Sequence, residues 1–422
     1  MPAFPVRSML ALSTLLMLAP ATALAQDTLK FDQIVAETAK LRGLPVKQAI
    51  VQDHLTRTQL EERLRDDLAT DYPPEEVAAD DRALEAFGLI PEKTDLGQLV
   101  LDLYTEQIAG FYDPETDEMY VIGDGKSLSA EEEFTYSHEI IHALQDQSFD
   151  LEAVQAPVED GTNDDQATAI VAMIEGDAVL SSVEYVLAHP VLAGKLALVD
   201  TPDSPQFDSA PAVISQSLLF PYTTGQAFVA ALREDGGWDA VNAAYADPPD
   251  TTEQVMHPEK YLKRDDPTAV TLPSLAGALG TGWTKAEENN FGEFQTAVLL
   301  ADLKVGEGFD AGGGANLPEE ATTAAAGWDG DRYAVWAKGD DDVIVWQSVW
   351  DSSDDATEFS RAMQAHDAKR FDSSWEGESP DDVALQAAGS FARIVQDGET
   401  ITYVLAPNLK LADAALSALP GA

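Results

Sequence analysis

The sequence contains no cysteine and only six histidines, and its 25 lysine and arginine residues are few for a chain of 422 residues. Without cysteine the chain cannot form disulfides, thiolate nucleophiles, iron–sulfur clusters or cysteine-type zinc fingers. The 75 acidic residues leave a formal net charge of −50, which repels phosphate backbones and argues against nucleic acid as a partner. The sequence also lacks a run of 18 uncharged apolar residues, so we expect no membrane span.

Apolar residues are nevertheless abundant, since 45% of the chain is hydrophobic and 8% is aromatic. This is enough to build a core and argues against disorder. The length favours two or three domains. We interpret most of the carboxylates as the solvated surface of an extracytoplasmic protein.

The N-terminus resembles a secretory signal peptide over residues 1–25. Arg7 supplies the basic region, Met9 to Leu18 form a short apolar run, and Ala23 to Ala25 form a small-x-small cleavage site. No cysteine follows that site, so a lipid anchor is not expected. The mature chain should begin near Gln26 after cleavage near Ala25, and the protein should be exported to a periplasm or the medium.

Hydrophobic periodicity predicts a mainly helical domain over residues 26–305, with a small β-sheet. Ser129 is the expected N-cap of the strongest helix, with Glu132 completing a capping box. We predict helices over 57–71, 98–109, 129–147, 165–188, 212–233, 237–245 and 291–304, an acidic loop over 150–163, and a β-hairpin from 110–112 and 119–122.

The C-terminal quarter changes in composition. Residues 306–327 are rich in glycine and alanine and are expected to form a linker, and five of the seven tryptophans follow residue 327. Residues 328–422 predict a small α+β domain with a ββαββα order, so the whole chain is expected to be α+β. We interpret the tryptophans either as an aromatic core or as a module that binds substrate.

The motif with the clearest chemistry is His138-Glu139-Ile140-Ile141-His142. Residues four apart lie on one face of a helix, so the two imidazoles can hold one Zn²⁺. Zinc activates water, and Glu139 is placed to take its proton as general base. The other interpretation of the pair is two ordinary structural histidines.

A catalytic zinc usually has three protein ligands. Glu175 is the best candidate for the third, because it lies on a separate helix between Ile174 and Ala178, where a carboxylate is costly to bury without a cation. Gly176 beside it should allow close approach of the two ligand-bearing helices. Asp146 and Asp164 are the alternatives. The metzincin pattern fails, because Gln145 and Ser148 stand where that class has glycine and histidine.

The histidine motif followed by Glu175-Gly176-Asp177-Ala178 resembles the gluzincin zinc metallopeptidases. More closely, it is similar to uncharacterised secreted bacterial members, in which the motif continues Ala143-Leu144-Gln145-Asp146-Gln147. The resemblance covers most of the mature chain, and its further blocks are Gly110 to Pro114, Phe220 to Phe228, Thr252 to Glu259 and Trp328 to Tyr333.

The resemblance implies a zincin-like fold in which His138, His142 and Glu175 bind zinc and Glu139 is general base and then general acid. It implies a peptide or protein substrate paired along an edge strand, either Gly110 to Tyr112 or Met119 to Ile122. The donor for the developing oxyanion would be His257, Tyr222 or Tyr261. Asp177 is a candidate acceptor for a ligating histidine.

The sequence therefore predicts an exported zinc-dependent peptidase. The alternative is a non-catalytic extracytoplasmic binding protein that keeps zinc for stability. The intact Glu139 favours the peptidase, because a structural site needs no base. Residues 26–95 could act as a propeptide, although they have no obvious propeptide pattern.

Overall fold

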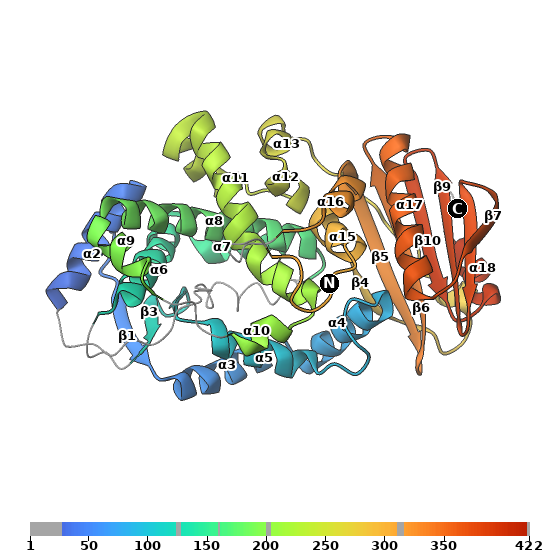
Figure 1. The fold of residues 1–422 in the computed structure, drawn as a ribbon, viewed down its shortest axis with the longest axis horizontal. Coiled ribbons are helices and arrows are strands. Elements are labelled where there is room, and N and C mark those ends of the chain that lie inside the picture. The colour runs from blue at the N-terminus through green and yellow to red at the C-terminus, as the bar shows by residue number, and fades with distance from the viewer. Residues whose placement is uncertain (1–27, 124–127, 159–160, 200–203, 310–315, 420–422) are drawn as a thin grey trace.

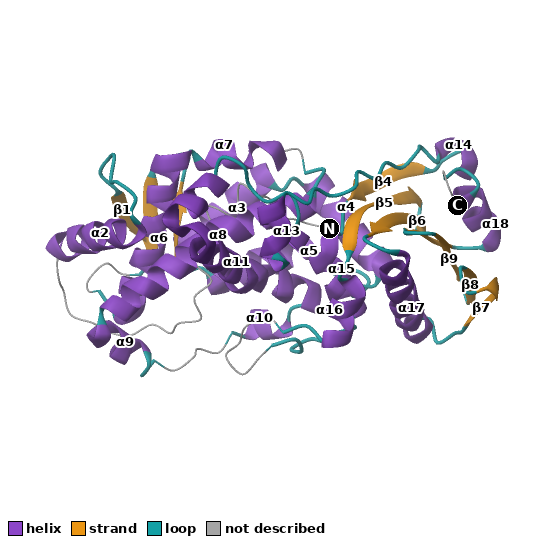
Figure 2. Cartoon of the chain, turned by 90° about the horizontal axis from the view of Figure 1, so that it is seen from above, coloured by secondary structure: helices purple, strands orange, loops and turns teal. Residues whose placement is uncertain are grey.

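The computed structural model describes residues 28–123, 128–158, 161–199, 204–309 and 316–419 (Figure 1). The expected signal peptide and the Gly312–Gly314 run of the expected linker lie outside these ranges. Helices make up most of the N-terminal part and a large β-sheet most of the C-terminal part (Figure 2). The chain is α+β, as its sequence predicts.

Each predicted helix is present within a few residues of its expected bounds, and the structure adds several helices that were not predicted. The predicted break between residues 233 and 237 is a kink inside one long helix, where Gly236 and Gly237 leave helical geometry. The predicted loop over 150–163 contains one short helix and a 3₁₀ turn. The helices are α2 (Thr28–Arg42), α3 (Arg57–Asp71), α4 (Pro74–Phe87), α5 (Leu96–Gln107), α6 (Ala130–Phe149), α7 (Leu151–Gln155), η1 (Ala156–Val158), α8 (Asp164–Ala188), α9 (Pro190–Leu196), α10 (Pro205–Ser209), α11 (Ala212–Ala244), α12 (Thr252–Met256), α13 (Pro258–Lys263), α14 (Ala276–Leu279) and α15 (Gly292–Leu300).

A three-stranded sheet packs beside α6. The hairpin of β2 (Gly110–Asp113) and β3 (Glu118–Ile122) is antiparallel, as predicted. β1 (Val51–Leu55) pairs with β3 in parallel, so the strand order is β1-β3-β2. Of the two strands expected to bind substrate, β3 is therefore internal, and only β2 lies at an edge.

The C-terminal sheet has seven strands in the order β4-β5-β6-β10-β9-β8-β7. It contains β4, β7 and β8 in addition to the predicted strands, and α16 lies within the segment expected to be a linker. β4 precedes that segment, inside the range predicted for the helical domain. The elements are β4 (Thr284–Asn289), α16 (Glu319–Ala325), β5 (Trp328–Lys338), β6 (Asp341–Trp350), α17 (Ser353–Arg370), β7 (Trp375–Ser379), β8 (Asp382–Ala387), β9 (Ser390–Asp397), β10 (Thr400–Ala406) and α18 (Leu409–Leu416).

One continuous hydrophobic core joins the helical part to this sheet. At the junction the ring of Phe87 on α4 lies 4.7 Å from that of Phe291 and 5.3 Å from that of Tyr333 on β5. Phe291 also stacks on Trp346 of β6, with centroids 4.5 Å apart. Four of the five tryptophans after residue 327 are buried, which supports their interpretation as an aromatic core.

Asp331 forms hydrogen bonds across the same junction. Its buried carboxylate accepts hydrogen bonds from the backbone N–H groups of Phe291 and Gly292, at the start of α15. It also accepts the indole N–H groups of Trp328 and Trp346. A carboxylate at a helix N-terminus satisfies free amides and the helix dipole. The block Trp328 to Tyr333 therefore has a structural role in joining the sheet to the helical part.

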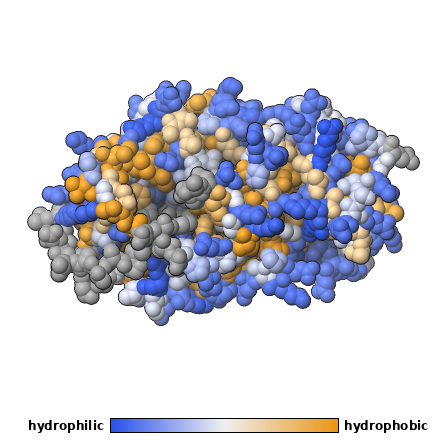
Figure 3. All heavy atoms as spheres, in the orientation of Figure 1, coloured by the Kyte–Doolittle hydropathy of each residue, from blue (hydrophilic) through white to orange (hydrophobic). Residues whose placement is uncertain are grey.

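The face seen in Figure 3 is mainly hydrophilic over the C-terminal part, and apolar residues show more over the helical part. Among the described residues, no helix combines the length and the apolar character needed to cross a membrane. More of the carboxylates are buried than the sequence suggests. Twelve described aspartates and glutamates are buried: Asp80, Asp113, Glu133, Glu139, Asp164, Asp165, Glu175, Asp177, Glu253, Glu293, Asp331 and Asp367.

Candidate metal centre

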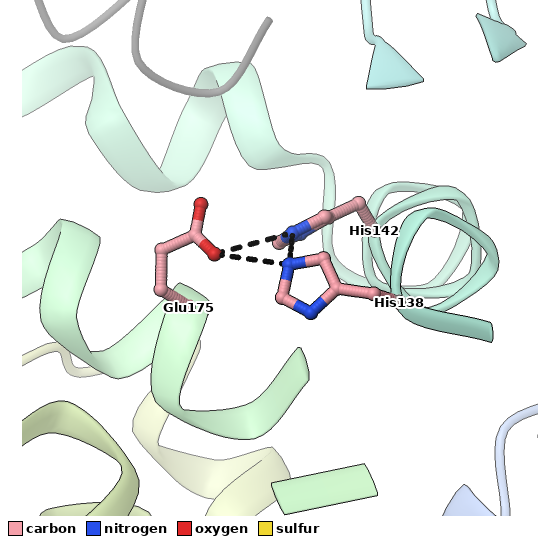
Figure 4. Close-up of side chains that lie close together, drawn as sticks. All are labelled: His138, His142 and Glu175. Atoms are coloured by element: carbon pink, nitrogen blue, oxygen red, sulfur yellow. Dashed lines mark hydrogen bonds and ion pairs between the residues drawn. The ribbon is translucent and has the colours of Figure 1, made fainter. Parts of the chain in front are cut away.

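Helix α6 carries the histidine motif, and its start is defined as predicted. The Ser129 side chain accepts from the N–H of Glu132, and the Glu132 carboxylate accepts from the N–H of Ser129 at 2.6 Å. This capping box fixes the first turn. Two turns later His138 and His142 project from one face of α6 towards α8, as Figure 4 shows.

Helix α8 supplies Glu175, and its position depends on contact with α11. An added Cβ on Gly225 of α11 would lie 2.1 Å from the backbone oxygen of Ala172, and one on Gly176 would lie 2.2 Å from the backbone of Gly225. The two glycines thus allow the α8 and α11 backbones to touch. The prediction for Gly176 was wrong about the partner, because the close approach is to α11 and not to α6.

We expect Gly225→Ala to destabilise the fold, since the new methyl group would meet backbone that cannot move aside. Overpacking of this kind costs about 1–3 kcal/mol. Gly194→Ala on α9 is the matched control, because a Cβ added there would meet no neighbouring group within 4 Å and alanine favours a helix. Urea unfolding of both variants tests this, and equal stability of Gly225→Ala and wild type would contradict the packing argument.

Three side-chain atoms converge between α6 and α8 (Figure 4). His138 Nε2 lies 3.1 Å from His142 Nε2, and Glu175 Oε2 lies 3.2 Å from the first and 3.5 Å from the second. All three side chains are buried, with residue exposures of 0–1%. The structure thus brings together the three candidate ligands named from the sequence, and they form the one group of potential metal ligands found in the described part of the chain.

The spacing of these atoms fits a tetrahedral metal. Two ligands about 2.0–2.1 Å from a tetrahedral ion are separated by about 3.3 Å. The three observed separations lie on either side of that value. Two imidazoles and a carboxylate are also a donor set that suits Zn²⁺. The residues present therefore fit a zinc ion, and one coordination position would remain for another ligand.

The surroundings favour the metal-binding protonation states. Burial lowers the pKa of His138, which keeps its imidazole neutral. Burial alone would raise the pKa of Glu175, but attraction and hydrogen bonding from the protonated forms of His142 and His138 lower it, so the carboxylate ionises before the imidazoles lose their protons. A neutral imidazole and an ionised carboxylate are the forms that bind a cation.

The alternative third ligands have other contacts. Asp146 accepts hydrogen bonds from the Tyr112 hydroxyl at 2.8 Å and the Leu151 N–H at 3.0 Å. Asp164 lies at the start of α8, where its N–H donates to Asn289. Neither belongs to the group formed by the histidines and Glu175.

Of the three candidate oxyanion donors, the structure brings Tyr222 to the centre. Its ring stacks with that of His138, with centroids 6.3 Å apart and an interplanar angle of 26°. Tyr222 lies on α11, one turn before Gly225, so the glycine contact sets its place. Tyr222 is partly exposed, whereas the three candidate ligands are buried.

His257 and Tyr261 are held elsewhere. His257 Nε2 lies 2.9 Å from Glu293 Oε1, a hydrogen bond that raises the pKa of His257. The Tyr261 hydroxyl donates to the carbonyl of Asp247. The contacts of both residues explain their places within the fold, and neither involves the metal ligands.

Asp177 does not contact a histidine directly. Its carboxylate accepts a hydrogen bond from Gln145 Nε2 at 3.1 Å, and Gln145 Oε1 lies 2.8 Å from His142 Nδ1. The expected acceptor for a ligating histidine is therefore Gln145, with Asp177 behind it. Sequence reasoning missed Gln145, although its position three residues after His142 places it one turn along the same helix face.

The family match that is found lies in the C-terminal part of the chain, outside the candidate metal centre. A family model described as a domain of unknown function (DUF8575) matches residues 281–416, which run from just before β4 to the end of α18. No match is found among curated proteins or among solved structures. The matched segment is the C-terminal sheet with its helices, and it does not include the candidate metal centre.

Proposed function

We propose that the protein is an exported zinc-dependent peptidase of the gluzincin type. The single observation that supports this most is the meeting of His138, His142 and Glu175 at tetrahedral spacing, on the two helices that the motif predicts. Export rests on the signal-like sequence of residues 1–25.

Zinc held by these residues would supply Lewis acidity towards water and the scissile carbonyl. Glu139 follows His138 directly on α6 and is fully buried. It would take the proton of the attacking water and pass it to the leaving nitrogen. Tyr222 is the candidate to donate a hydrogen bond to the developing oxyanion.

Strand β2 is the candidate edge for an extended substrate. Gly110 on β2 lies against Thr135 of α6, one turn before His138, with an added Cβ only 2.7 Å from the Thr135 methyl group. The substrate would pair with β2 by main-chain hydrogen bonds, since β3 is paired on both sides.

We expect Glu175→Ala to weaken zinc binding by more than about 100-fold. Loss of a residue that only supports a ligand weakens metal binding by about 10- to 100-fold, and loss of a ligand itself should cost more. Glu184→Ala is the matched control, because Glu184 lies on the same helix and pairs with Arg233 away from the centre. Zinc titration against a competing chelator measures both. Unchanged affinity in Glu175→Ala would remove Glu175 from the ligand set and make Asp164 the next candidate.

The peptidase assignment itself is tested with zinc-loaded and chelator-treated protein on unstructured protein substrates. We expect one zinc per chain and cleavage that chelation abolishes and added zinc restores. Less than about 0.1 equivalent of zinc after zinc-replete preparation would reject the metal site and the enzyme together.

The second candidate function is a non-catalytic extracytoplasmic binding protein that keeps zinc for stability. The near-complete burial of all three ligands and of Glu139 favours it, because structural metal sites are closed to solvent. This protein would bind zinc and unfold more easily without it, but it would cleave no peptide.

A further inference from the structure

The side chain of Gln145 is held between three groups, all buried. Its Nε2 lies 3.0 Å from the carbonyl oxygen of Ile174 and 3.1 Å from Asp177 Oδ2. Its Oε1 lies 2.8 Å from His142 Nδ1. Gln145 itself is fully buried, so water does not compete for these positions.

These neighbours determine which way the amide points. A carbonyl oxygen and an ionised carboxylate only accept hydrogen bonds, so both must face the NH₂ group of Gln145. The opposite orientation would put the amide oxygen against two acceptors and leave the NH₂ group facing His142. The amide oxygen therefore faces His142 Nδ1 and can only accept from it.

The orientation of Gln145 in turn determines the tautomer of His142. A hydrogen bond to the amide oxygen requires the hydrogen on Nδ1, which leaves the lone pair of neutral His142 on Nε2. Nε2 is the atom that faces His138 and Glu175. The hydrogen-bonded chain thus prepares His142 to bind a cation before one arrives.

Two further segments of the chain hold Asp177 in place. Arg42 on α2 donates to it from Nε at 2.7 Å and from Nη2 at 3.0 Å, and neither side chain has any exposed surface. Tyr245, just after α11, donates its hydroxyl to Asp177 at 2.8 Å. Arg42 also lies over the ring of Trp238, 4.2 Å from its centroid. The charge of Asp177 is therefore compensated, and its carboxylate is held facing Gln145.

We propose that Gln145 is a positioning residue that holds His142 as the Nδ1–H tautomer, and that Arg42 and Asp177 orient Gln145 for this role. Helix α2, 135 residues before Asp177 in the chain, is then an integral support of the metal centre. The inference rests on the proposed function only in assuming that the centre binds a metal.

The test is nitrogen-15 NMR of the histidine rings in the metal-free protein at alkaline pH, where free imidazole is neutral. The His142 signals are assigned from the spectrum of His142→Gln. In the wild type we expect Nδ1 to carry the hydrogen and Nε2 to give the shift of an unprotonated nitrogen. The opposite assignment in the wild type would overturn the proposal without any variant of Gln145.

Gln145→Met removes the amide but keeps the length of the side chain. We expect this variant to show a mixture of His142 tautomers and to bind zinc about 10- to 100-fold more weakly. Gln155→Met is the matched control, because Gln155, the last residue of α7, is also buried and donates to the carbonyl of Leu151 within its own helix. A merely structural role of Gln145 would lower stability without changing the tautomer, and wild-type zinc affinity in Gln145→Met would reject the proposal.

The two proposals fail separately. If the wild type has the expected tautomer and binds zinc but cleaves no peptide, the peptidase assignment falls and the role of Gln145 stands. If the wild type cleaves peptides with His142 in the other tautomer, the peptidase assignment stands and the proposed role of Gln145 falls.

Discussion

Glu139→Gln is expected to keep its zinc and to lose peptide hydrolysis. The carboxylate is the one group that the motif provides for moving the proton of water, and loss of a positioned general base costs about 100- to 10,000-fold in rate. Glutamine has the same shape and no charge, so the buried site should tolerate it. The three ligands come from other positions on α6 and α8, and zinc affinity should remain within a few-fold of wild type.

The measurement is turnover of zinc-loaded protein, with zinc content determined on the same samples. Glu131→Gln, in the first turn of the same helix, is the matched control and should keep wild-type activity. Full activity in Glu139→Gln would rule out Glu139 as the base. A zinc protein with no activity in either form would favour the non-catalytic alternative.

Arg42→Met is expected to destabilise the metal-free protein by about 3–5 kcal/mol, the usual effect of removing one partner of a buried ion pair. Asp177 would keep its hydrogen bonds from Tyr245 and Gln145 but lose the only formal positive charge that contacts it among the described residues. The cost should therefore fall on the fold as a whole and also on zinc affinity, through Gln145.

Urea unfolding gives the change in the free energy of unfolding. Lys40→Met is the control, because Lys40 is in the same last turn of α2 but is exposed. Replacing both partners, in Arg42→Met with Asp177→Leu, should cost less than Arg42→Met alone, because no buried charge remains unpaired. If Arg42→Met is as stable as Lys40→Met, the buried pair does not support the fold.

The same pair bears on residues 26–95, which the sequence leaves open as a propeptide. A removable propeptide would be expected to leave behind an intact core. Here removal of α2 would leave Asp177 without Arg42 and would open the contact of Phe31 with Tyr136, whose rings lie 5.3 Å apart on α2 and α6. Removal of a propeptide that included α2 would therefore leave a buried carboxylate without its cation.

The elements nearest the metal centre could be predicted because their signals are local. A capping box defines α6, helical periodicity defines α8, and two short aromatic runs around a proline-containing turn define the hairpin. The histidine pair needs only the geometry of a helix. Glu175 followed from the cost of burying a lone carboxylate, an argument that also depends on one helix.

What the sequence missed depends on contacts between distant segments. β1 is a short polar strand that is stabilised by pairing with β3. β4 is likewise stabilised by pairing with β5. Arg42 and Gln145 show no local sign of meeting around Asp177. His366 is buried with Nδ1 2.6 Å from Asp302 Oδ1, a contact between residues 64 apart that nothing in the local sequence indicates.

The supports of the metal centre come from widely separated parts of the chain, and this has a consequence for folding. Arg42 contacts Asp177 across 135 residues and Asn242 across 200. Contacts of such separation close large loops and form late. Because synthesis starts at the N-terminus, α2 is made long before α8 and the end of α11. The centre is therefore complete only when most of the helical part has assembled, so zinc would enter a nearly finished fold and would not guide its early steps.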